Sequence, residues 1–359
     1  MGLLGLAPAQ CTQNLACDPT DPACDASSVI SFLVLFGPRA VLWPHSGLNQ
    51  CYDGAASATC PVSGFPRQDA DYFRARTFTP LGNGSMVRDE GTGLVWQRCV
   101  VGHSWDGSTC SGAPQSLTHA AAISACQTLS TNIGGQWRLP TFRELSTFYK
   151  YDGSNPAADP ADFPGLPGAT GLWSSSIYQG NPTNGLATNL GTGVVINYSL
   201  TLSRYVLCVA GPNYDNADFR VVEAGVVQDL TTGDYWTACP LNNSGGLDSS
   251  AGCAGPGLLA NWSAALQSCN NLDGTAGING WRLPSLRELM AIPDYNSVSG
   301  SMMNDTYFPN GPASAWTATT AVYNSLDTAF VLQLGATATL TQNPLKTTNL
   351  NFYCISNGQ

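Results

Sequence analysis

The sequence is poor in charged residues, and above all in lysine. Only 11% of its 359 residues are charged, and Lys150 and Lys346 are its two lysines. The formal net charge of −10 leaves no basic patch to contact phosphate groups. We therefore expect no nucleic-acid binding, and no strong attraction to anionic membranes or sulfated polysaccharides.

Long apolar runs are also missing. No stretch approaches the ~18 apolar residues that mark a membrane-spanning helix, so we expect no membrane span. Residues 1–10 resemble the end of a signal peptide with a small-residue cleavage site, but lack its positively charged start.

A repeated sequence motif, called the repeated phrase below, reveals how the rest of the chain is divided. Residues 137–145 (WRLPTFREL) return as residues 281–289 (WRLPSLREL), and the offset between matching landmarks stays between 140 (Trp96 to Trp236) and 146 (Cys208 to Cys354). A nearly constant spacing between matching residues indicates that the chain contains two copies of one structural unit. We expect an N-terminal extension at 1–84 and two tandem modules at 85–211 and 212–359.

Thirteen cysteines indicate an oxidising compartment. Each module carries four in matching places, and no Cys-x-x-Cys pair suggests a metal site. We expect no metal or other cofactor, and an extracellular or periplasmic protein. The predicted disulfides are Cys99–Cys110, Cys126–Cys208, Cys239–Cys253, Cys269–Cys354 and Cys51–Cys60. In the N-terminal extension, Cys17–Cys24 is a further local pairing, which leaves Cys11 either unpaired or bonded to another chain.

The sequence predicts that each module has an α+β fold. It opens with two short strands around a Thr-Gly turn, as at Met86–Asp89 and Leu94–Trp96. A helix near 118–130 carries an apolar stripe that includes Cys126, and the repeated phrase begins a second helix. Short strands among long Gly/Pro/Asn loops complete the unit.

The repeated phrase predicts structural roles for its polar residues. Thr141 with Glu144, and Ser285 with Glu288, form capping boxes. Arg138 and Arg282 are expected to pair with a carboxylate or with backbone carbonyls; the alternative is that they clamp a ligand. Asp89 and Asp229 are expected to stabilise their turns. The three histidines have no counterparts in the second module, so we expect no catalytic residues and no enzyme. An enzyme would require a polar cluster that only folding reveals, with strongly perturbed pKa values.

The most apolar run lies in the N-terminal extension, at residues 29–36. Its length and β-branched content predict a strand buried on both faces. The strand either packs within this chain or is donated to a neighbouring molecule by β-augmentation. The residues expected to form this assembly strand are Val29, Ile30, Phe32, Leu33, Val34, Leu35 and Phe36.

Two further groups of residues are candidate surface sites. Trp173 and Trp316, set among Ser and Thr, either line a sugar-binding shelf or plug a loop-rich domain. Asn-x-Ser/Thr sequons, which are glycosylation acceptors in a glycosylating host, occur at Asn83, Asn197, Asn242, Asn261 and Asn304.

Taken together, the repeated motifs resemble a known family. The order Asp-x-x-Thr-Gly-x-x-Trp, a helix with Cys, Trp-Arg-Leu-Pro-[Thr/Ser]-x-Arg-Glu-Leu, Trp-[Ser/Thr] and a final Cys looks like the Lcl C-terminal domain family. That resemblance covers about 85–211 and 222–359 and implies a secreted bacterial protein with a C-type-lectin-like fold. In that fold a cysteine on the first helix is bridged to the last strand, which Cys126–Cys208 and Cys269–Cys354 match. The Glu-Pro-Asn, Gln-Pro-Asp and Trp-Asn-Asp strings of calcium-dependent lectins are absent, so calcium-dependent sugar binding is not implied.

Two functions follow as expectations. The first is a non-enzymatic structural protein of the bacterial cell surface, whose copies assemble head-to-tail into a fibre or pilus-like filament through the N-terminal strand. The alternative is a monomeric adhesin that binds glycan or protein through the loops of its modules.

Overall fold

A computed structural model describes most of the chain after residue 42. The described residues are 43, 45–155, 157–167, 171–215, 217–250, 252–253, 255, 257–295, 302–335 and 340–358. The run at 29–36 lies outside the described residues, as do Cys11, Cys17 and Cys24. The N-terminal strand and the fate of these three cysteines therefore stay predictions.

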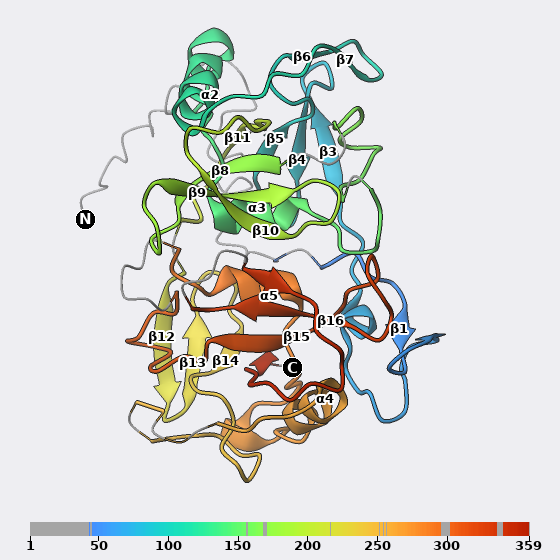
Figure 1. The fold of residues 1–359 in the computed structure, drawn as a ribbon, viewed down its shortest axis with the longest axis vertical. Helices are drawn as coiled ribbons and strands as arrows, with labels where there is room; N and C mark the ends of the chain where they lie inside the picture. The colour runs from blue at the N-terminus through green and yellow to red at the C-terminus, as the bar shows by residue number, and fades with distance from the viewer. Residues whose placement is uncertain are drawn as a thin grey trace, which may run out of the picture. The chain divides into compact units, whose positions relative to one another are not determined.

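Each module contains a four-stranded antiparallel sheet of the same strand order (Figure 1). In the first module, β3 (Phe78–Leu81), β4 (Met86–Asp89), β5 (Val95–Gln97) and β11 (Val209–Ala210) are arranged as β11-β5-β4-β3. In the second, β12 (Phe219–Glu223), β13 (Val226–Asp229), β14 (Tyr235–Thr237) and β18 (Ile355–Ser356) are arranged as β12-β13-β14-β18. The last strand of each module thus pairs with the third.

The first sheet extends beyond the boundary expected at residue 85. Strand β3 pairs along its whole length with β4, from Phe78 opposite Asp89 to Leu81 opposite Met86. Its counterpart β12 holds the same edge position beside β13. The two edge strands share little sequence, so the repeat did not reveal them.

A second, three-stranded sheet completes each module. Strands β8 (Gly171–Ile177), β9 (Asn184–Asn189) and β10 (Val195–Ser199) form it in the first module. Strands β15 (Ser314–Thr320), β16 (Ala329–Gln333) and β17 (Thr341–Gln342) form it in the second. The register shifts after Trp173 and after Trp316, which is a further point of agreement between the copies.

The helices lie where the repeat predicts them. The first helix of each module is α2 (His119–Ile133) or α4 (Trp262–Asn270), and the helix after the repeated phrase is α3 (Phe142–Phe148) or α5 (Leu286–Ala291). Minor elements are β1 (Cys51–Tyr52), β2 (Ser57–Ala58), η2 (Asp69–Tyr72), β6 (His103–Trp105), β7 (Cys110–Gly112) and η3 (Thr275–Gly277). The fold class is α+β. Among the described residues, every helix is too short or too polar to span a bilayer.

Both capping boxes are present. Thr141 Oγ1 accepts the Glu144 N–H at 3.2 Å, and the Glu144 carboxylate accepts the Thr141 N–H at 2.9 Å. Ser285 and Glu288 make the same two bonds at 3.3 and 2.8 Å. Helices of six and seven residues are too short to form unaided, so these bonds help to fix where each helix begins.

A single hydroxyl deletion tests the contribution of the cap. Ser285→Ala is expected to lower the free energy of unfolding by about 1 kcal/mol, because a first-turn N–H then loses its acceptor. Urea denaturation followed by tryptophan fluorescence measures the change. Ser325→Ala, at an exposed position, is the matched control and should leave the midpoint unchanged. Equal effects of the two substitutions would contradict the capping role.

Five disulfides join the same pairs that the sequence suggested: Cys51–Cys60, Cys99–Cys110, Cys126–Cys208, Cys239–Cys253 and Cys269–Cys354. The two widest span 82 and 85 residues, and each ties the first helix of its module to the start of the last strand. All four of their cysteines are fully buried.

The two modules share one hydrophobic core. Helices α3 and α5 contact each other where the modules meet (Figure 1), and a single buried cluster includes Phe142 and Leu145 with Leu286 and Leu289. The ring of Phe142 lies 4.8 Å from that of Tyr295, centroid to centroid. The repeated phrase therefore supplies the surface through which each copy packs on the other.

Candidate functional site

Trp173 and Trp316 are not surface residues. Both are 0% exposed, and their indole N–H groups donate to the carbonyls of Leu117 and Ala260, each at 2.9 Å. The sugar-shelf interpretation of these residues is therefore wrong, and the plug interpretation describes them. Their Ser and Thr neighbours gave a false signal of exposure, because those hydroxyls are themselves buried; Ser174, for example, donates to the Leu186 carbonyl.

The sequon asparagines differ in exposure. Asn83 and Asn261 are exposed, whereas Asn197, Asn242 and Asn304 are partly buried. Asn261 Oδ1 accepts the Ala264 N–H and so caps α4. The two exposed positions are the ones where we expect a glycosylating host to attach a glycan.

Each repeated arginine–glutamate pair forms a bidentate ion pair. Arg138 donates to both carboxylate oxygens of Glu144 at 2.5 and 2.6 Å. Arg282 donates to both oxygens of Glu288 at 2.7 and 2.6 Å. The expected pairing of the two arginines with a carboxylate is confirmed, and each glutamate also serves its capping box.

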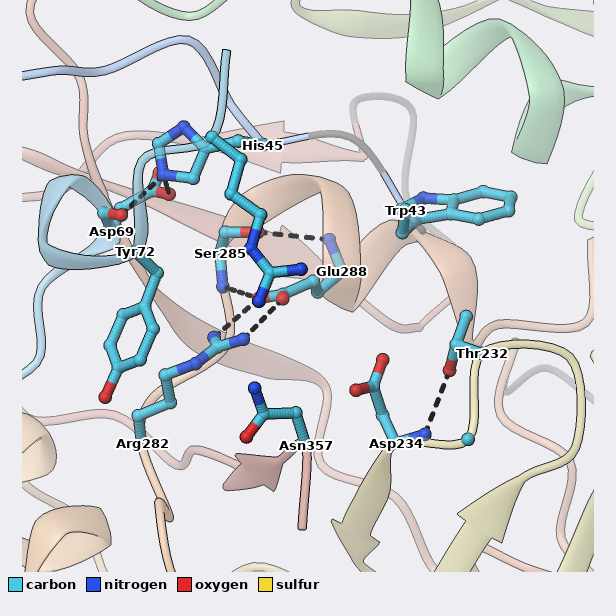
Figure 2. A pocket seen from close by; sticks show the side chains of 12 residues that line it. Trp43, His45, Asp69, Tyr72, Thr232, Asp234, Arg282, Ser285, Glu288 and Asn357 are labelled. Atoms are coloured by element: carbon cyan, nitrogen blue, oxygen red, sulfur yellow. Dashed lines mark hydrogen bonds and ion pairs between the residues drawn. The ribbon is translucent and has the colours of Figure 1, made fainter. Parts of the chain in front are cut away.

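A polar pocket lies beside the second of these pairs. It has a volume of about 320 Å³ and is built from five parts of the chain: Trp43 with His45, η2 with residue 74, the β13–β14 turn, residues 282–288 at the start of α5, and residue 357 (Figure 2). Its lining residues are Trp43, His45, Asp69, Tyr72, Arg74, Thr232, Gly233, Asp234, Arg282, Ser285, Glu288 and Asn357. Sequence reasoning found this site only in part, through the repeated phrase.

One wall of the pocket is a buried ion pair. His45 Nε2 lies 2.8 Å from Asp69 Oδ1, and the Thr319 hydroxyl donates to Asp69 Oδ2 at 2.5 Å. Burial alone would raise the pKa of Asp69, but the His45 charge and the hydrogen bonds to the carboxylate bring it below its usual value. Burial opposes ionisation of His45 as well, yet Asp69 raises the His45 pKa overall. Both groups are therefore engaged with each other and join η2 to β15.

The opposite wall carries a carboxyl group that titrates near neutral pH. Burial, reinforced by the negative charge of Glu288, raises the pKa of Asp234 from 3.8 to about 7. Figure 2 shows the Asp234 and Asn357 side chains reaching toward Glu288 and Arg282. The hydroxyl of Ser285 already accepts the Glu288 N–H. This arrangement offers hydrogen-bond acceptors to a ligand, and Asp234 is the group whose charge a ligand or pH would change.

Asp234 gives the protein a predictable pH dependence. Because its folded-state pKa lies above the unfolded value, the folded state holds the proton more tightly, and stability falls as pH rises from about 4 to about 7. Because solvent at the open side of the pocket screens the charge, we expect the free energy of unfolding to fall by only about 2 kcal/mol across that pH range. Asp234→Asn should remove this loss, as measured by urea denaturation at pH 4.5 and 8. Glu90→Gln, at an exposed position, should retain it; an unchanged pH slope in Asp234→Asn would contradict the assignment.

One cluster among the described residues has the spacing of metal ligands. It consists of Cys51, Cys60 and Asp71. The two sulfur atoms are joined in a disulfide, so they are not thiolates free to bind a metal.

The family comparison agrees with the duplicated architecture. The model of the Lcl C-terminal domain matches residues 85–210 and again residues 225–356. These two ranges contain both four-cysteine sets and both copies of the repeated phrase. No curated protein matches the chain.

Proposed function

We propose, from the premise that this chain belongs to the Lcl C-terminal domain family, that it is a non-enzymatic structural protein of the bacterial cell surface. Copies of the protein would assemble head-to-tail into a fibre or pilus-like filament through the strand at 29–36. A donated strand makes a contact that propagates when successive rotations do not close.

One observation supports the structural role above all. Most polar groups of the repeated phrase are engaged inside the molecule, in capping boxes, in two ion pairs and in the contact between modules. Two buried guanidinium nitrogens of Arg143 and two of Arg287 have no hydrogen-bond partner among the described residues. Arg143 is 1% exposed and donates to Asp229 of the other module at 3.2 Å. Residues that recur in both copies thus hold the fold together and join the copies.

The compartment and the fold are part of the same proposal. Five disulfides in one chain are typical of proteins that fold outside the reducing cytosol. The bridge from α2 to the start of β11, and from α4 to the start of β18, supports a C-type-lectin-like fold for each module.

The filament is tested by imaging the oxidised full-length chain. Negative-stain micrographs should show ordered filaments for the wild type. The double variant Leu33→Asp with Leu35→Asp should show none, because two carboxylates cannot be buried in an apolar strand pairing. Leu202→Asp, at a position that is 45% exposed, is the control and should polymerise normally. Wild-type protein that stays monomeric under all conditions would overturn the proposal.

The pocket at Glu288 favours a second candidate function. A monomeric surface adhesin would bind a partner through such a pocket, without forming a filament. Protein that stays monomeric yet adheres to a surface, and loses adhesion when the pocket is blocked, would establish this alternative.

A further inference from the structure

The duplication provides an internal comparison for the pocket. In the first module the chain runs on past β11, contacts the Arg138–Glu144 pair and covers the Glu144 side chain, which is 0% exposed. The Tyr214 N–H donates to Glu144 Oε1 at 2.9 Å, and Arg138 donates to the Pro212 carbonyl at 2.7 Å. The Tyr214 hydroxyl reaches the carbonyl of Thr92 in the β4–β5 turn at 2.7 Å. Residues 211–215 therefore act as a built-in peptide ligand of the first module.

The second module has the same receptor groups around an open space. Arg282, Glu288 and Thr232 stand where the first module has Arg138, Glu144 and Thr92. The Tyr72 ring lies over the Arg282 guanidinium at 4.6 Å, but among the described residues no backbone N–H donates to Glu288 Oε1 as that of Tyr214 does to Glu144. A pocket of about 320 Å³ lies beside this oxygen. The Glu144 side chain is 0% exposed beneath Tyr214, whereas that of Glu288 is 17% exposed. Within the described residues, Glu288 Oε1 receives its hydrogen bond from Arg282 alone.

We propose that this pocket is a binding site for an extended peptide segment of a partner protein. A backbone N–H of the peptide donates to Glu288 Oε1, a preceding carbonyl accepts from Arg282, and the next side chain enters the space beside the β13–β14 turn. A carboxylate accepts a second hydrogen bond at the same oxygen without rearrangement, because each oxygen has two lone pairs. Charge-assisted bonds of this kind are stronger than neutral ones.

A difference between the modules narrows the choice of side chain. Leu94 in the first module is replaced by Asp234 in the second, and Asp234 lines the pocket. The Asp234 carboxyl has a hydrogen bond with the Thr232 side chain and keeps further acceptor positions, so a side chain that donates a hydrogen bond fits this surface better than one that cannot. Tyrosine can donate such a bond and has the size of the side chain that fills the first module, whereas phenylalanine cannot donate one.

This site does not depend on filament formation. A filament subunit and a monomeric adhesin would use it equally, and the strand at 29–36 takes no part in it. Failure of the imaging experiment would leave the peptide site standing, and failure of peptide binding would leave the filament standing.

The probe is the peptide acetyl-Gly-Pro-Asn-Tyr-Asp-amide, which has the sequence of residues 211–215. Isothermal titration into the oxidised full-length protein is expected to give a Kd in the range of about 10 μM to 1 mM, typical of a short flexible ligand. Replacing the peptide tyrosine with phenylalanine should weaken binding about tenfold, through loss of a hydrogen bond in a desolvated site.

Two protein variants distinguish the site from nonspecific binding. Asn357→Trp, which fills the pocket, should reduce affinity by at least about tenfold, whereas Leu202→Trp should match the wild type. Asp234→Leu, which copies the first module, should retain binding but lose the preference for tyrosine over phenylalanine. Thermal melting confirms that each variant is folded. No binding at about 5 mM peptide, or binding that Asn357→Trp leaves unchanged, would overturn the proposal, as would an unaltered tyrosine preference in Asp234→Leu.

Discussion

Asp229→Asn is expected to lower the free energy of unfolding by about 3 kcal/mol, although it changes one atom. Asp229 and Arg143 are both about 1% exposed, and the carboxylate accepts the guanidinium N–H at 3.2 Å across the junction of the modules. Burial lowers the pKa of Arg143, and Asp229 is the largest influence that opposes this fall. Removing the negative charge leaves a buried cation without its partner, which costs more than the pair contributes.

A double-mutant cycle isolates the buried charge as the cause. Asparagine still accepts the Thr231 N–H in the turn, so the turn itself is largely preserved. Arg143→Met combined with Asp229→Asn should therefore be more stable than Asp229→Asn alone, because no unpaired charge remains. Urea denaturation of the four proteins measures the coupling. A double variant that loses the sum of the two single effects would contradict the explanation.

Removal of the Cys269–Cys354 disulfide is expected to cost about 4.5 kcal/mol. The bridge closes a loop of 85 residues, and the constraint on the unfolded chain grows with the logarithm of loop length. The paired change to alanine should be compared with the same change at Cys51–Cys60, which spans only 9 residues and should cost about 2.5 kcal/mol by the same relation. Denaturation in urea without reductant gives both values.

The order of these two effects is the informative result. Both double substitutions remove one disulfide bond, so any difference between them comes from loop length. The Cys269–Cys354 disulfide closes the longer loop and is therefore expected to contribute more to the free energy of unfolding than Cys51–Cys60. An equal or smaller effect at Cys269–Cys354 would contradict the explanation by loop length.

The repeat made much of the fold predictable from sequence. Equal spacing of landmarks located matching helices, and Thr141 and Ser285 marked the first residues of α3 and α5 because a capping box is a local signal. Cysteines in matching places suggested bridges that the structure contains. In each case the information lay within a few residues or in the comparison of one copy with the other.

Other features had only a partial signal in the sequence, or none. The pocket draws His45, Asp234, Arg282 and Asn357 together from positions more than 300 residues apart, between 45 and 357. Strand β3 lies outside the repeated phrase, and its pairing is determined by the sheet it joins. Arg143 meets Asp229 only because α3 and α5 pack together. Local patterns cannot specify such long-range contacts, which depend on tertiary packing.

The repeated phrase acts as scaffolding that joins the two modules into one cooperative unit. Differential scanning calorimetry of the oxidised protein tests it most directly. The shared core around α3 and α5 predicts a single transition whose calorimetric and van't Hoff enthalpies agree. Two separate transitions, each with about half the enthalpy, would show that the modules unfold independently and would contradict the account.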